Sequence, residues 1–120
     1  MKKIKTFEDA CKALGISSDI KIDVSQLSES EQKYFIANYK LMIIARALNA
    51  GWIPDWNNSS ERKWYPWFRM SGFGFSFSDC DDWRTSTDCG SRLCFKSEKI
   101  ADYAGKQFES LYRDLLTLDK

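Results

Sequence analysis

Aromatic and basic side chains lie close together in the middle third of the chain, where they could bind a ligand by stacking and by charge. All five tryptophans fall between Gly51 and Phe95, in a stretch broken by Gly, Asn, Ser and Asp. Aromatic faces combined with guanidinium and ammonium groups hold single-stranded nucleic acid or a nucleotide, at about 1 to 3 kcal/mol per stacked base. The candidate ligand-binding residues are therefore Trp56, Arg62, Lys63, Trp64, Tyr65, Trp67, Arg69, Trp83 and Arg84.

The alternative is that the same aromatic residues build the hydrophobic core or a subunit interface, as large aromatics in a small domain commonly do. The 18 Lys and Arg nearly balance the 17 Asp and Glu. This near-neutral charge argues against a protein that holds duplex nucleic acid mainly by neutralising phosphates. It favours the alternative of a structural or protein-interaction role.

No motif in the chain specifies a reaction. Histidine, the commonest general base near neutral pH, is absent. Four aspartates crowd the segment 79–90, but acids in such a segment are typical of solvated turns. The Gly105-Lys106 pair lacks the upstream glycine and the following Ser or Thr of a phosphate-binding loop. We therefore expect a protein that is not an enzyme and has no catalytic residues.

Neither metal nor cofactor binding is expected. The alternation of polar residues from Asp55 to Glu61 only partly matches a calcium loop, since the turn glycine and the distal glutamate are missing. The cysteines Cys11, Cys80, Cys89 and Cys94 lack the paired spacing of a zinc site. Free thiols are the expectation in a reducing compartment, although Cys80 and Cys89 bracket one loop and could pair in an oxidising one.

The elements expected around these residues form an α+β domain. Thr6 to Leu14 is expected to be a short helix that stops at Gly15. Ser28 and Glu31 form a capping box that opens a long central helix closed by Gly51. The segment 16–27 between them is expected to be an edge strand or an extended linker.

A small antiparallel meander of about three strands is expected next, followed by a C-terminal amphipathic helix capped by Ser97. The strands are Lys63–Met70, the alternating phenylalanines 73, 75 and 77, and Arg92–Phe95, with an acidic loop at 79–90. Pro66 removes a ladder donor, so the first strand should be an edge or bulged strand. Gly105 is expected to permit close helix packing.

The length of 120 residues supports one hydrophobic core, so residues 1–120 are expected to fold as a single domain. No run approaches the roughly 20 apolar residues that span a bilayer, and the polar start does not resemble a secretory signal. We expect no membrane association and a cytoplasmic location.

Five strings of residues are distinctive: Asp55–Ser59, Trp64–Phe68, Gly72–Phe75, Gly90–Ser97 and Tyr103–Phe108. On these strings the chain resembles a group of short uncharacterised proteins encoded by phages and mobile elements of gut Bacteroidales, and the likeness covers nearly its whole length. The group has no assigned activity, so the resemblance implies only a setting: a phage or prophage protein in the bacterial cytoplasm or in the virion.

Together these observations predict a non-enzymatic phage-type binding protein. Its aromatic and basic sheet region is expected to engage single-stranded nucleic acid or a nucleotide. The alternative is a virion component or a host-factor binder in which the aromatics form a subunit interface, with a copy of itself or another protein as partner.

Overall fold

The first two helices begin and end where side chains and backbone conformation satisfy their terminal groups. The computed structural model describes residues 3–71 and 74–118. Helix α1 (Phe7–Leu14) is capped by Thr6, and Gly15 ends it in the left-handed conformation. Helix α2 (Glu29–Asn49) begins at the predicted capping box, in which Ser28 and Glu31 each accept a hydrogen bond from the other's backbone N–H.

The end of α2 differs slightly from the prediction that Gly51 closes it. The helix ends at Asn49, and both Ala50 (φ 48°) and Gly51 (φ 90°) have positive φ values. The connector 16–27 contains no described strand, so it is an extended linker.

The predicted aromatic strands form a hairpin of β1 (Lys63–Ser71) and β2 (Gly74–Trp83). The strands are antiparallel, with a bulge between Trp67 and Phe68. The prediction of an acidic loop at 79–90 was wrong at its start, because residues 79–83 belong to β2 and pair with β1. Phe73, predicted to lie in this strand, is outside the described residues.

The third strand predicted at Arg92–Phe95 is reduced to a single bridge. Trp64 and Phe95 exchange two backbone hydrogen bonds of 2.9 and 2.7 Å, and the described sheet has two strands. Alternate residues of a strand direct their backbone groups to the same edge. Pro66, two residues after Trp64, is therefore the next residue of β1 that would donate to the segment 92–95. It has no N–H, so the pairing ends there.

The C-terminal amphipathic helix is divided into α3 (Glu98–Gln107) and α4 (Glu109–Leu116). Ser97 caps α3 as predicted. Phe108 (φ −112°, ψ 29°) interrupts the helical backbone and is itself buried. The bend lets α3 pack on both strands of the hairpin while α4 packs along α2.

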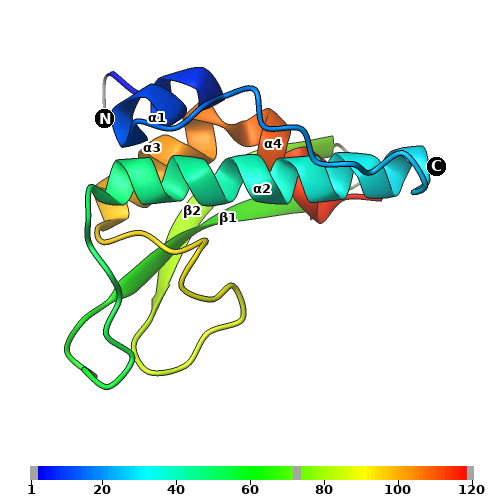
Figure 1. Cartoon of the computed structure of the whole chain (residues 1–120). Helices are drawn as coiled ribbons and strands as arrows, with labels where there is room; N and C mark the ends of the chain where they lie inside the picture. Colours follow the sequence, from blue (N-terminus) through cyan, green and yellow to red (C-terminus); the bar gives the residue numbers. More distant parts are fainter. Residues whose placement is uncertain (1–2, 72–73, 119–120) are drawn as a thin grey trace.

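The chain is thus an α+β fold, as predicted, in which α3 and α4 pack on the hairpin and α2 packs on α1, α3 and α4 (Figure 1). Helix α2 contacts both α1 and α4, and the core forms where these helices meet α3 and the bridge segment. Its most buried side chains include Leu41, Ile44 and Phe95. Two long loops, 50–62 and 84–93, extend from the base of the hairpin (Figure 1). None of the helices in the described part of the chain is long and apolar enough to cross a membrane.

The hairpin approaches α3 most closely at Gly105, which confirms the predicted packing role of this glycine. A Cβ atom at position 105 would lie 2.8 Å from the Cβ atom of Pro66 and closer still to the ring of Phe77. The Phe77 ring could rotate, but the Pro66 ring is fixed to the β1 backbone. A side chain at this position would therefore push α3 away from the sheet.

We expect Gly105→Ala to lower the free energy of unfolding by about 1 to 3 kcal/mol, the usual effect of overpacking. This loss would outweigh the gain of about 1 kcal/mol that alanine brings in helix propensity. Urea unfolding followed by tryptophan fluorescence would measure it. Lys99→Ala, at an exposed position of the same helix, should change stability by about 0.5 kcal/mol or less. A stabilised Gly105→Ala protein would contradict the packing argument.

Candidate functional site

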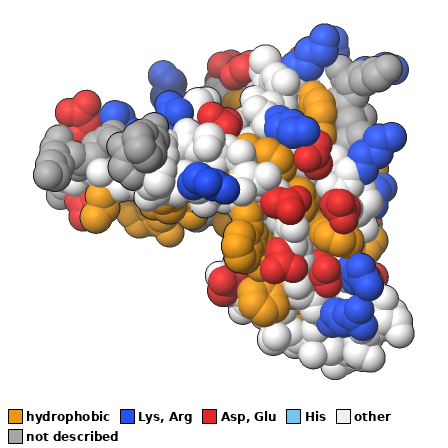
Figure 2. Space-filling model, turned by 180° about the vertical axis from the view of Figure 1, so that it is seen from behind, with side chains coloured by type: hydrophobic (Ala, Val, Ile, Leu, Met, Phe, Trp, Pro, Cys, Tyr) orange, Lys and Arg blue, Asp and Glu red, His pale blue; other side chains and the backbone are white. Residues whose placement is uncertain are grey.

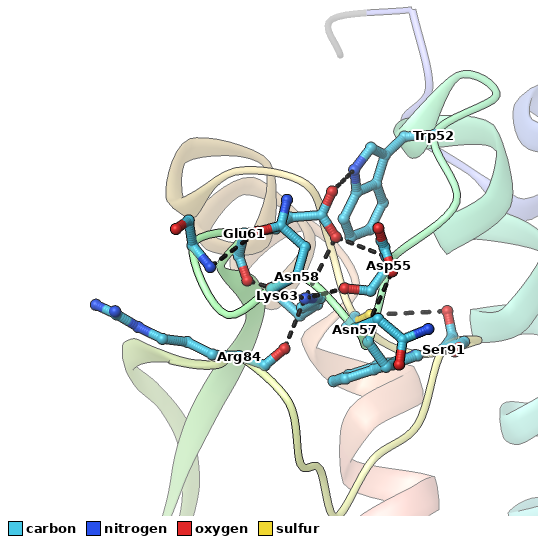
Figure 3. Close-up of polar contacts among 11 residues, drawn as sticks. Trp52, Asp55, Asn57, Asn58, Glu61, Lys63, Arg84 and Ser91 are labelled. Atoms are coloured by element: carbon cyan, nitrogen blue, oxygen red, sulfur yellow. Dashed lines mark hydrogen bonds and ion pairs between the residues drawn. The ribbon is translucent and has the colours of Figure 1, made fainter.

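The loop that precedes β1 is organised around a buried ammonium group. The side chain of Lys63 is 0% exposed. Its Nζ donates to the backbone carbonyls of four residues at distances of 2.6 to 3.1 Å (Figure 3). These acceptors come from both long loops and are Asp55, Asn58, Glu61 and Arg84. Because its donors point inward, Lys63 is not available to a ligand, although it was predicted to bind one.

Glu61 supplies the negative charge beside this ammonium group. Its carboxylate lies 3.4 Å from Nζ of Lys63 and accepts hydrogen bonds from the backbone N–H of Asp55 and from Nε1 of Trp52. The hydrogen bond from Asp55 is the main reason that the pKa of Glu61 lies below its ordinary value, and Trp52 and Lys63 contribute to the same shift. The ion pair and these hydrogen bonds together close the loop 50–62 on itself.

Trp56 connects this loop to the second one. The Lys63 ammonium lies 5.1 Å from the centre of the Trp56 ring, and the indole N–H donates to Oγ of Ser91 over 2.6 Å. Trp56, predicted to stack on a ligand, is therefore half-buried between the two loops. Its contacts fix the loop 84–93 relative to the base of the hairpin.

Two further predicted ligand-binding residues are Trp64 and Arg62. Trp64 lies on the opposite face of β1 from Lys63, and Arg62 immediately precedes the strand. The backbone of Trp64 forms the bridge to Phe95, and its half-buried ring packs against the core. The Arg62 guanidinium lies 5.9 Å from the centre of that ring. In this contact the exposed Arg62 side chain covers one face of the Trp64 ring.

Three of the predicted aromatic residues share the face of the hairpin that points away from α3. The rings of Tyr65 and Trp83 stack with centres 5.6 Å apart and planes 11° apart, and Trp67 is 52% exposed. In the antiparallel register Tyr65 lies opposite Asp81 and Trp67 lies opposite Asp79, which places each pair on the same face. Burial raises the pKa of Tyr65, and the charges of Asp81 and Asp88 raise it further. The environment of these rings is therefore acidic.

The two remaining basic residues of the predicted site are exposed but far from each other along the hairpin. Arg69 pairs with Ser76 near the turn, whereas Arg84 follows the last residue of β2. Only the backbone of Arg84 joins the Lys63 cluster, and its side chain extends away from it (Figure 3). The structure thus brings Tyr65, Trp67 and Trp83 together but does not gather the predicted cations around them.

An open groove lies between the hairpin, the loop 84–93 and the helices α2 and α4. It consists of two adjoining cavities of about 590 and 360 Å³ that share Asp88, Leu93, Leu115 and other residues. Figure 2 shows this region as a corner between the two arms of the molecule, with hydrophobic side chains on both sides. We call it the corner groove and define it by Tyr34, Tyr65, Trp67, Leu93, Leu115 and Leu116.

Sequence reasoning missed the helical half of this groove. Tyr34 is 43% exposed on α2, and Leu116 is 44% exposed at the end of α4. The sequence offered no clear signal, because Leu116 lies four residues after the buried Tyr112, on the same face of the helix. What the sequence did not show is that these two helix surfaces meet beside Trp67.

The cysteines give no sign of a metal or nucleophile site. All four are free thiols, and Cys80 and Cys89, the predicted optional pair, are not bonded. Burial is the main reason that the pKa values of Cys80 and Cys94 are raised to about 12, so neither is a thiolate at neutral pH. No cluster of three or more Cys, Asp or Glu suited to a metal ion occurs within residues 3–71 and 74–118.

We expect Lys63→Met to lower the free energy of unfolding by about 2 to 4 kcal/mol. The substitution keeps the length of the side chain but leaves several backbone carbonyls without their donor and the Glu61 carboxylate without its counter-ion. Urea unfolding would measure the change, with the exposed Lys96→Met as the matched control. Equal stability of the two variants would show that the ammonium group does not organise the loops.

The lowered pKa of Glu61 predicts a pH-dependent contribution to stability. A carboxyl group whose pKa is lower in the folded chain than its ordinary value of 4.5 stabilises the fold above that value, and the contribution disappears as the pH falls through the lowered pKa. Glu61→Gln should therefore be less stable than the wild type near neutral pH, and the difference should shrink on acidification. Urea titrations at several pH values would measure it, with Glu8→Gln as an exposed control. A difference that does not change with pH would contradict this assignment.

No protein-family model, curated protein or solved structure matches this chain. The comparisons therefore transfer neither an activity nor a ligand to the corner groove. The features of the groove that bear on function are its shape, its exposed side chains and its charge.

Proposed function

We propose that this chain is a protein-interaction protein that binds a partner protein through the corner groove. The observation that carries the proposal is the exposure of large apolar side chains around one concave surface. Tyr34, Trp67 and Leu116 are between 43 and 52% exposed there, on three different elements. Contiguous apolar surface of this kind commonly marks an interaction site, and Trp and Tyr are the residues most enriched at the energetic centres of interfaces.

The shape of the groove supports a macromolecular partner over a small ligand. Both cavities are open to solvent along the corner visible in Figure 2. A small molecule is usually held in a pocket that covers most of its surface, whereas an open apolar groove suits a protein segment. In the phage setting that the sequence resemblance implies, the partner would be a host factor or another component of the particle.

Single-stranded nucleic acid remains the second candidate, and the exposed Trp67 beside the stacked rings of Tyr65 and Trp83 is the observation that favours it. The distribution of charge gives it less support. Lys63 is buried, Arg69 and Arg84 lie apart, and the carboxylates of Asp79 and Asp81 share the face of these rings. Phosphates would be repelled by this face.

A photo-crosslinking residue, p-benzoylphenylalanine, placed at position 67 or 116 tests the proposal in cells that contain the partner. We expect each groove position to give a discrete adduct, because the bound protein would lie within reach of the probe. Position 20 is the matched control, since Ile20 is 54% exposed and does not line the groove. The mass of the adduct would tell a second copy of this chain from another protein.

Adducts that form equally at position 20, or that are absent from both groove positions, would contradict the proposal. Thermal unfolding of each labelled protein should match that of the wild type, because Trp67 and Leu116 are substantially exposed and lie outside the most buried part of the core. This check separates loss of an interface from loss of the fold.

A further inference from the structure

The face of β1 and β2 that borders the corner groove carries negative charge that the chain does not neutralise. Asp81 and Asp79 lie opposite Tyr65 and Trp67, and Asp88 lines both cavities of the groove, whereas Arg92 lines only the larger one. Asp79 and Asp81 each accept a hydrogen bond from the next backbone N–H. Among the described residues, no Lys or Arg forms an ion pair with any of these three carboxylates.

The aromatic rings of the same face also lack a cation of their own. Elsewhere in the described part of the chain, a Lys or Arg lies over five rings, including Lys106 over Phe77 and Arg113 over Phe75. Within residues 3–71 and 74–118, no such contact involves Tyr65, Trp67 or Trp83. Aromatic faces beside carboxylates attract guanidinium and ammonium groups, so this face is complementary to a cation brought by a partner.

The edge of β1 indicates how a partner segment would dock. An extended peptide would add to this edge through backbone hydrogen bonds, but Phe95 already occupies the position at Trp64. The next outward donor position is Pro66, which has no N–H. Strand addition is therefore blocked where the groove begins. The walls formed by Tyr34 of α2 and Leu116 of α4 suit a helix that inserts side chains.

We propose that the corner groove binds a basic amphipathic helix of the partner protein. Leucine-like side chains of that helix would enter the groove between Leu93, Leu115 and Leu116. Its Lys or Arg side chains would meet Trp67, Asp81 and Asp88 at the rim. This inference rests on the proposed function and adds the chemistry of the partner to it.

Two designed helical peptides with a fluorescent label test the inference. Both carry leucines at helical i, i+3, i+4 and i+7 spacing, and the remaining positions are lysine and arginine in one and glutamate in the other. Fluorescence anisotropy would measure their binding to the intact chain at low and moderate salt. We expect the basic peptide to bind at least about tenfold more tightly, a difference of about 1.4 kcal/mol.

Variants of the chain separate the two parts of the contact. Asp81→Asn with Asp88→Asn should weaken binding of the basic peptide about fivefold or more and reduce its salt dependence. Leu116→Ser should weaken it through the loss of apolar contact. Glu8→Gln with Asp19→Asn removes the same charge from exposed positions elsewhere and should leave binding nearly unchanged.

The outcomes distinguish failure of this inference from failure of the proposed function. Equal binding of both peptides, or equal weakening by the control variant, would overturn the charge preference. If photo-crosslinks at positions 67 and 116 still form, the groove remains a protein-interaction site. Both proposals would be overturned if Leu116→Ser did not weaken peptide binding and no specific crosslinks formed at positions 67 and 116. Tighter binding of a labelled single-stranded oligonucleotide than of the basic peptide would also overturn this inference in favour of nucleic acid.

Discussion

The buried ammonium group of Lys63 is the constraint on which the arrangement of both long loops depends. A charged amine can be buried only if its donors are satisfied, and here the acceptors are backbone carbonyls from segments far apart in the sequence. Because Lys63 donates to carbonyls of both segments, the loop 50–62 lies against the end of β2. Trp56 then extends the same arrangement to Ser91 in the loop 84–93. One wall of the corner groove is therefore positioned by a residue that does not line it.

The aromatic residues of the middle third divide into two groups with different tasks. Trp52 and Trp56 hold the loops through their indole N–H groups, and the backbone of Trp64 joins the hairpin to the core segment at Phe95. Tyr65, Trp67 and Trp83 face away from α3, and Trp67 remains half exposed. The division explains how a small domain can be rich in tryptophan and still expose few of these residues. It also reduces the surface available for ligand binding to one face of the hairpin and its border with α4.

The placement of charge decides between the candidate functions more strongly than the number of charges. The basic residues near the aromatics are used inside the chain or are spread along the hairpin, whereas carboxylates lie directly across from Tyr65 and Trp67. A protein with balanced charge can therefore present an acidic aromatic surface. Such a surface suits a cationic protein segment better than a phosphate backbone.

The local features of this protein could be predicted from its residues alone: the Thr6, Ser28 and Ser97 caps, the α+β class, the alternating strands and the packing role of Gly105. These follow from hydrogen bonds and spacings within a few residues. Other features became visible only in the folded chain: Lys63 is buried, the C-terminal helix bends at Phe108 and the third strand is one bridge. The groove that Leu116 and Trp67 share is another such feature. Each of these depends on contacts between residues distant in sequence, where competition for the same buried space determines which side chains are covered.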